Sequence, residues 1–272
     1  MDYVVSKIKF GTSNKTLIAK LNTRSAIRDL CYINNLGFVF IHSGVIGLVN
    51  LKGQINYGFI IDNVEDPVSL CYSTKHYICC VLEKGGKSLK YFELKDNNLI
   101  PFLGDVYQRK LNELLKNFSI DTICSYGCLD DDKNVYYMYN DLNKGLKFTN
   151  SEFKHFIGKG KSGYSSSNDL LGLMFNKPSG IAFYDRKFYI ADTGNHCVRL
   201  LNGTLSTLIG SPFDSSLNPT KISVKNKLGY FISSDQIYYF TLEGKNGSCY
   251  RSEKLVSFDM DEQKNLYVVE TL

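Results

Sequence analysis

The chain has 272 residues, of which 43% are hydrophobic and 22% are charged, and its formal net charge is +5. This composition is that of a folded protein with a sizeable core and argues against a disordered chain. No apolar run approaches the roughly 18 residues of a membrane-spanning helix, so we expect no membrane segment. The charge excess is small, whereas nucleic-acid-binding domains usually carry a larger and more clustered basic excess. A chain of this length folds as two ordinary domains or as one large all-β domain.

The amino terminus, MDYVVSKIKF, alternates apolar and polar positions and has an acidic second residue. It lacks the basic and apolar regions of a secretory signal. The eight cysteines lack the paired C-x-x-C spacing of a zinc site. We therefore expect a cytoplasmic protein whose cysteines are reduced and mostly buried.

Four strand patterns joined by turns occupy residues 178–210. They are GIAFY (180–184), KFYIAD (187–192), CVRLL (197–201) and TLSTLIG (204–210). This spacing predicts one four-stranded antiparallel sheet. A sheet that is apolar on both faces cannot bury them alone, so a repeat of about 40 residues predicts sheets packed around a common axis.

The same unit recurs loosely along the chain. Its first strands are RDLCY (28–32), VSLCY (68–72), DTICS (121–125), SGIAF (179–183), TKISV (220–224) and KLVSF (254–258). Each has a small side chain at the matching place: Cys31, Cys71, Cys124, Ala182, Ser223 and Ser257. Small side chains have a steric reason there, because six first strands crowd the axis. Second strands follow as GFVFIH, HYICCV, VYYMYN, FYIADT, GYFISS and LYVVET. We predict an all-β fold, a six-bladed β-propeller of four-stranded antiparallel blades.

We expect a single domain over residues 1–272. Its blades cover approximately residues 26–60, 66–104, 119–160, 178–210, 219–250, and 255–272 together with 2–21. The last blade uses both chain ends, since 255–272 supplies two strands and YVVSKIKF and KTLIAKL supply two more. Pairing the N-terminal and C-terminal strands in one blade would close the ring and remove exposed sheet edges.

Two segments depart from the repeat. Residues 105–118 place Leu111, Leu114, Leu115 and Phe118 at helical spacing, which predicts a helical insertion that packs on the ring or docks a partner. Residues 158–177 form a Gly- and Ser-rich loop, whose GKGKSG run lacks the full phosphate-loop pattern.

A family resemblance covers about 50 residues around the fourth repeat. It rests on Gly158-Lys-Gly160, Gly163-Tyr164, Phe175, Pro178, Gly180-Ile-Ala182, Tyr189-Ile-Ala-Asp192-Thr193, Gly194-Asn195-His196 and Val198-Arg199. These residues resemble the NHL repeat, with NHC in place of NHL, and LVSFDMDEQKNLYVVET resembles a second, weaker copy. The resemblance implies a six-bladed β-propeller and no single activity, because its members include RNA-binding, protein-binding and enzymatic propellers.

In a propeller, the loops between second and third strands and the loops between blades share one face, which we call the loop face. Ligands usually meet this face near the axis, by analogy at the level of the fold. Aligned second strands place Ile41, Cys80, Tyr139, Asp192, Ser233 and Glu270 near its mouth. Our candidate ligand or partner face therefore comprises Asp192, Asn195, Ser233, Glu270 and His42.

Asp192 and Glu270 have two interpretations. They could form an acid/base pair or a cation site, or Asp192 could cap the turn that follows it. Metal-dependent enzymes among similar propellers use several histidines from different blades. The four histidines here, His42, His76, His155 and His196, are spread too widely for a zinc site, which needs three or four ligands at one point. We expect no metal and no cofactor.

Lysines and acids alternate on both faces. The predicted loop face carries Arg24, Lys84, Lys87, Lys144, Lys159, Lys161 and Lys177 beside Asp62, Glu65, Asp66, Glu83, Asp141, Asp214 and Asp235. Mixed signs do not make a phosphate track, so RNA binding is not favoured. The acidic runs Asp130–Asp132 and Asp259–Glu262 are most simply polar turn residues.

These observations favour a non-enzymatic scaffold that binds a protein partner or assembles into a larger complex. Two alternatives stay open. The first is a propeller enzyme of the lyase or hydrolase type that uses Asp192 and Glu270, and the second is an RNA-binding NHL-type module.

Overall fold

A computed structural model describes residues 1–272 except 35, 43, 58–63, 65–66, 84–88, 96–97, 102–123 and 150–152. The predicted helical insertion at 105–118 lies outside the described residues. Within the described part of the chain, no helix is long and apolar enough to span a membrane.

Among the described residues, strands β1 to β24 form five hydrogen-bonded sheets. One contains β1 (Asp2–Ile8), β2 (Lys15–Asn22), β23 (Leu255–Met260) and β24 (Leu266–Thr271), in the spatial order β2-β1-β24-β23. Another contains β3 (Ile27–Ile33), β4 (Gly37–His42), β5 (Val45–Val49) and β6 (Ile55–Asn56), in chain order. A third contains β7 (Pro67–Ser73), β8 (Ile78–Glu83), β9 (Leu89–Lys95) and β10 (Asn98–Pro101).

The other two sheets come from residues 124–251. An eight-stranded sheet joins β11 (Cys124–Leu129), β12 (Val135–Tyr139), β13 (Lys144–Phe148) and β14 (Phe153–Ile157) to β15 (Gly180–Tyr184), β16 (Lys187–Asp192), β17 (Cys197–Asn202) and β18 (Thr204–Gly210). A short 3-10 turn, η2 (Thr193–Asn195), connects β16 to β17. The last sheet contains β19 (Pro219–Lys225), β20 (Leu228–Ser233), β21 (Gln236–Thr241) and β22 (Asn246–Arg251).

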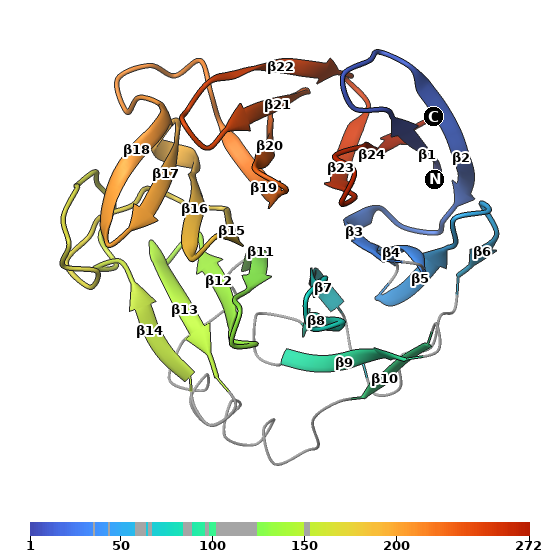
Figure 1. Ribbon diagram of the computed structural model, residues 1–272, viewed down its shortest axis with the longest axis horizontal. Coiled ribbons are helices and arrows are strands. Elements are labelled where there is room, and N and C mark those ends of the chain that lie inside the picture. The colour runs from blue at the N-terminus through green and yellow to red at the C-terminus, as the bar shows by residue number, and fades with distance from the viewer. Residues whose placement is uncertain are drawn as a thin grey trace.

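The sheets stand radially around a central axis, as predicted for a β-propeller (Figure 1). Strands β3, β7, β11, β15, β19 and β23 lie nearest the centre. The two chain ends meet in one sheet, where β1 pairs antiparallel with β24 from Tyr3 opposite Thr271 to Ile8 opposite Leu266. Within the eight-stranded sheet, the two halves meet at one parallel bridge between Tyr126 and Gly180, supported by the Tyr126 N–H donating to Ser179 O at 3.1 Å.

Second strands lie inside their sheets and pack on both faces. All six residues of β4, β8 and β20 are buried. This double burial explains why these strands are continuous apolar runs instead of alternating ones. The core is consequently divided among the spaces between neighbouring sheets, as where Phe38 of β4 contacts Tyr267 of β24 with ring centroids 4.3 Å apart.

The turn before β4 requires glycine. Gly37 has φ +124°, and a Cβ there would lie 2.1 Å from the carbonyl oxygen of Val49. Since that conformation and that contact both exclude a side chain, the β3–β4 hairpin depends on this residue.

Candidate functional site

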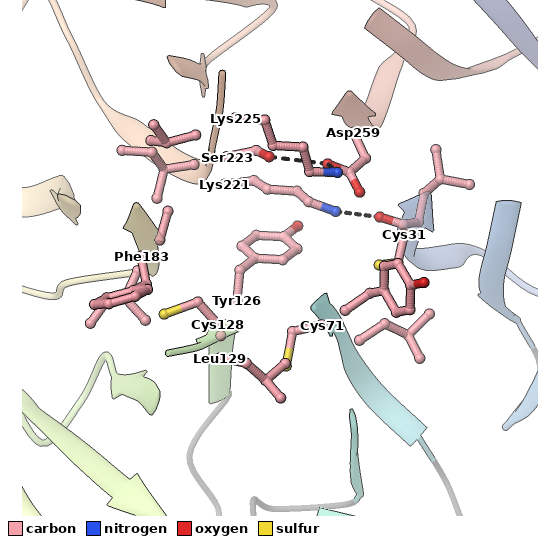
Figure 2. Close-up of a pocket in the computed structure, with 18 residues that line it drawn as sticks. Cys31, Cys71, Tyr126, Cys128, Leu129, Phe183, Lys221, Ser223, Lys225 and Asp259 are labelled. Atoms are coloured by element: carbon pink, nitrogen blue, oxygen red, sulfur yellow. Dashed lines mark hydrogen bonds and ion pairs between the residues drawn. The ribbon is translucent and has the colours of Figure 1, made fainter. Parts of the chain in front are cut away.

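A cavity of about 100 Å³ lies where the inner strands meet. It is lined by backbone and side chains of β3, β7, β11, β15, β19 and β23, and Figure 2 shows Lys221, Lys225 and Asp259 facing it from one side. Three thiols, Cys31, Cys71 and Cys128, also line it. We call this the axial cavity.

The lining corrects two positions of the predicted small-residue column. In the third repeat the strand is Cys124–Leu129, later than the predicted 121–125, and Cys128 lines the cavity. In the sixth repeat Asp259 lines it, whereas Ser257 is fully buried and is not part of the lining. The slip from Ser257 to Asp259 is by two residues, which leaves the alternation of strand faces unchanged and so cannot be seen in the pattern. In β11 a register shift between Cys124 and Gly127 moves the alignment, and no local pattern reveals it.

A buried ion pair crosses this centre. Asp29 of β3 and Lys221 of β19 are 192 positions apart, and the Lys221 ammonium donates to the Asp29 carboxylate, to Leu30 O at 2.6 Å and to Ser257 Oγ at 3.3 Å. Asp29 also accepts the backbone N–H of Leu70 in β7 at 2.9 Å. One ion pair therefore ties together β3, β7, β19 and β23.

A second pair repeats this arrangement. Asp259 of β23 accepts the backbone N–H of Tyr32 at 2.8 Å and the Ser223 hydroxyl at 3.1 Å. Lys225 donates to Met260 O at 2.6 Å, with its ammonium 3.8 Å from Asp259 Oδ1. The prediction that Asp259 is a polar turn residue is wrong, since it lies in β23 beside Lys225. The sequence indicated no pairing for any of these four residues, because nothing local distinguishes them from surface charges.

The protonation states of these groups follow from burial and pairing. Burial alone lowers the pKa of Lys221, but attraction to Asp29 and Asp259 outweighs it and holds the pKa above its ordinary value. The ammonium therefore stays charged. Burial raises the pKa of Cys31 and Cys128 well above the usual range, so both thiols stay protonated and weakly nucleophilic.

Asp192 and Asn195 belong to a buried cluster where β16 ends and η2 begins. The Asp192 carboxylate accepts the Asn176 N–H at 2.9 Å and the Asn195 side-chain amide at 2.8 Å. Arg199, whose side chain is fully buried, places one guanidinium nitrogen 3.3 Å from Asp192. Burial raises the pKa of Asp192 to about 6 despite these partners. The predicted capping role is wrong, because no side-chain hydrogen bond from Asp192 caps the backbone of the following turn η2; the carboxylate turns instead toward Arg199 and the preceding loop.

The same cluster holds the Gly- and Ser-rich loop 158–177. Arg199 donates to Ser165 O and to Ser166 Oγ at 3.2 Å, and its guanidinium lies 4.3 Å from the centre of the Tyr164 ring. Asn195 donates to Gly163 O at 2.8 Å. Asn195 and Arg199 of the motif therefore have a structural role, because these contacts hold the loop against its sheet.

The other three predicted residues are also buried and engaged. Ser233 accepts the Asn218 N–H at 2.8 Å. His42 Nε2 lies 3.1 Å from Tyr57 O. Glu270 accepts from Lys15 and, at 2.6 Å, from the Tyr250 hydroxyl. Burial raises the pKa of Glu270, but the hydrogen bonds from Lys15 and Tyr250 outweigh it and lower the pKa below its ordinary value.

The structure does not join Asp192 and Glu270 in one site, since each has its own cation. The strand register adds a third carboxylate at this position. Glu83 of β8, which the sequence placed only among the charges of the loop face, lies opposite the start of its first strand where alignment had placed Cys80. Glu83 Oε1 is 3.0 Å from Lys90 Nζ of β9. Loop-end carboxylates of three sheets are thus each neutralised by a cation of the same sheet.

The acidic runs are turn residues as predicted, except that Asp259 lies within β23. Asp130 accepts the N–H groups of Asp132 and Asn134, and Asp261 accepts those of Gln263 and Asn265, all at 2.9 Å. Among the described residues, no group of three or more His, Cys, Asp or Glu side chains could hold a metal ion.

The loop face of β11 to β19 is held by a row of hydrogen bonds. Asn140 donates to Ser179 Oγ at 3.3 Å, the Ser179 and Thr193 hydroxyls are 2.6 Å apart, and Thr193 donates to Pro219 O at 2.6 Å. His196 Nδ1 lies 2.9 Å from Leu217 O. This row fixes the three adjoining connections relative to one another.

Four lysines and one phenylalanine project from these connections. Lys144, Lys159, Lys161 and Lys177 form no ion pair with any described residue, and the last three are exposed. Phe213 is 95% exposed on a turn in which its N–H donates to Ser211 Oγ and Asp214 N–H donates to Ser211 O. We call these five residues the basic rim. Of the charged residues predicted on this face, Lys84, Lys87, Asp62, Glu65 and Asp66 lie outside the described residues, whereas Asp141 and Asp214 are described and exposed.

Comparison with known proteins places the fold among characterised structures. Residues 175–199 match the NHL repeat. No curated protein matches the chain. Similar solved structures include a gluconolactonase from Xanthomonas campestris, with TM-score 0.64 and 10% identity over 97% of this chain and 94% of that chain. They also include virginiamycin B lyase from Staphylococcus aureus, with TM-score 0.58 and 13% identity over 99% and 88% of the two chains. A chain of the nidogen/laminin complex has TM-score 0.62 and 11% identity over 98% and 97%.

Proposed function

We propose that this chain, a β-propeller that carries an NHL repeat, is a non-enzymatic binding module that docks a protein partner on the basic rim of its loop face. The observation that carries the proposal is the 95% exposure of Phe213 on a hydrogen-bonded turn. Aromatic side chains dominate the energetic centres of protein interfaces. Burying this ring in a partner would contribute about 2 kcal/mol.

The chemistry of the rim favours an acidic partner segment. Lys159, Lys161 and Lys177 are exposed and have no acidic partner among the described residues, so their charge is available to a carboxylate-rich surface. Because the hydrogen-bonded row from Asn140 to Pro219 fixes the connections beforehand, docking would cost little ordering of the backbone.

We also propose the number of blades and the way in which the ring closes. We infer six blades, with β11–β14 and β15–β18 counted separately because one parallel bridge joins them. In this account the ring is closed by β1 and β2 completing the blade of β23 and β24. A cytoplasmic location is supported by the cysteines, since Cys31, Cys71, Cys79, Cys80, Cys128, Cys197 and Cys249 are free.

An enzymatic role has less support from the site. Two similar structures are of a lyase and a gluconolactonase, but at 13% and 10% sequence identity they support the fold and not an activity. In this chain Asp192 and Glu270 are buried and paired with Arg199 and Lys15, so neither faces a substrate.

The test is an affinity pull-down from the native source with the full chain, with and without nuclease. We expect a protein retained after nuclease by the wild type, lost with Phe213→Ala and weakened by Lys159→Glu/Lys161→Glu. Phe10→Ala is the matched control, because Phe10 is 47% exposed and lies outside the rim. Retention of the same partner by Phe213→Ala would refute the docking surface, and material released by nuclease would point to RNA.

A further inference from the structure

A tyrosine hydroxyl lies at the axial cavity. Tyr126 of β11 lines the cavity and is half-buried, and none of the side-chain hydrogen bonds between described residues involves its hydroxyl. Figure 2 shows this hydroxyl pointing toward the side of the cavity that holds Lys221, Lys225 and Asp259. The Lys221 ammonium lies 4.9 Å from the centre of the Tyr126 ring.

Lys225 supplies further unused donors. Its ammonium has three N–H donors, of which one reaches Met260 O at 2.6 Å. Asp259 Oδ1 is 3.8 Å away, too far for a hydrogen bond. Lys225 is half-buried, with 16% of its side chain exposed, and it lines the cavity, so its side chain is accessible to a ligand there.

The carboxylates around the cavity, by contrast, already accept several hydrogen bonds. Asp29 accepts from Lys221 and from the N–H groups of Leu30 and Leu70. Asp259 accepts from Ser223 and from the N–H groups of Tyr32 and Met260. The Lys225 ammonium and the hydroxyls of Tyr72 and Tyr126 therefore offer donors that these carboxylates do not take up, which suits a ligand rich in acceptor oxygens.

The opposite side of the cavity is apolar. Cys71, Cys128 and Leu129 lie away from the lysines, with Phe183 beside them (Figure 2). The volume of about 100 Å³ holds several water molecules or a ligand of about six non-hydrogen atoms. A ligand that satisfies both sides has an anionic head and a short hydrocarbon body.

We propose that the axial cavity binds a small aliphatic carboxylate, whose oxygens accept from the Tyr126 hydroxyl and the Lys225 ammonium while its hydrocarbon end contacts Cys71, Cys128 and Leu129. This site is separate from the basic rim and does not depend on the proposed protein partner. Inorganic phosphate would satisfy the donors but would leave the apolar side empty.

The test titrates butyrate into the purified chain by calorimetry and ligand-observed NMR, with butyramide and inorganic phosphate as comparison probes. We expect one butyrate per chain with a dissociation constant below about 1 mM. Butyramide, which lacks the charge, and phosphate, which lacks the apolar body, should each bind at least about tenfold more weakly.

Variants separate the site from the fold. Tyr126→Phe removes one oxygen that has no internal partner, so we expect an unchanged thermal midpoint and at least about fivefold weaker butyrate binding. Lys225→Met should weaken binding further, and Lys245→Met, at an exposed lysine, should leave it unchanged. If Lys225→Met does not fold, Tyr126→Phe decides alone. No saturable binding at about 20 mM butyrate, wild-type affinity in Tyr126→Phe, or phosphate binding as tight as butyrate would each overturn the proposal.

Discussion

Replacing Lys221 by methionine should loosen the centre of the ring. The aliphatic stem is largely kept, but the ammonium that joins β19 to Asp29, Leu30 and Ser257 is lost. Asp29 is fully buried, so its carboxylate would stay in the interior without its cation. Because Asp29 also holds the Leu70 N–H, the disturbance should spread to β7.

The expected loss in the free energy of unfolding is about 3–5 kcal/mol, the usual effect of removing one partner of a buried ion pair. For a chain of this size, 1 kcal/mol shifts the thermal midpoint by about 2–4 °C. A loss of about 4 kcal/mol then lowers the midpoint by about 8–16 °C. The double variant Asp29→Asn/Lys221→Met has no uncompensated charge, so its loss should be smaller than the sum of the two single losses by about 2 kcal/mol.

The assay is thermal and urea unfolding followed by far-UV circular dichroism and by tyrosine fluorescence, since the chain has 19 tyrosines and no tryptophan. Lys245→Met makes the same substitution at an exposed site and should stay within about 0.5 kcal/mol of the wild type. A loss below about 1 kcal/mol for Lys221→Met, or additive effects in the double variant, would show that the pair does not stabilise the ring.

Two further predictions concern pairs at the loop ends of the strands. Arg199→Lys should destabilise the fold by about 2–4 kcal/mol, because lysine cannot reproduce the guanidinium contacts to Asp192 and the loop. The variant should also be cleaved faster by trypsin at Lys161, with Arg251→Lys, at an exposed arginine, as its control. Equal trypsin resistance of Arg199→Lys and the wild type would contradict the role of Arg199 in holding the loop. Glu270→Gln should cost about 1 kcal/mol at neutral pH. Because the folded-state pKa of Glu270 lies below its ordinary value of 4.5, the stabilisation is present above that pH and is lost as the pH falls through the folded-state pKa. The difference in thermal midpoint between wild type and variant should therefore shrink below about pH 4.5, and a constant difference down to pH 2 would refute the assignment.

Strand order and turn positions were accessible from local sequence. GFVFIH and LYVVET match the bounds of β4 and β24, and the fourth repeat divides into β15 to β18 much as its turns predict. In the repeats that differ most from the fourth, the predicted positions of the first strands were wrong by a few residues. Cys124 was chosen over Cys128 because both are small residues of one strand, and the register shift between Cys124 and Gly127 leaves no local signal.

The candidate site was less predictable, since its residues lack a shared local signal. Asp192 and Asn195 were found through the motif, but their roles as partners of Arg199 and Gly163 depend on the loop folding back over the sheet. Glu83 was placed only among the charges of the loop face, because the end of β8 is set by its pairing with β7, in which Pro67 lies opposite Glu83. The exposure of Phe213 depends on how the β18–β19 connection turns.

Local sequence was enough to predict the all-β class, the four-strand unit and the NHL-type repeat, because strand alternation, turn residues and a motif within 50 residues are local properties. Which charged groups meet at the axis became visible from the folded chain alone. Asp29 and Lys221 stand 192 positions apart in different repeats. Their meeting depends on the register of several inner strands, and hydrophobic alternation does not distinguish registers that differ by two residues.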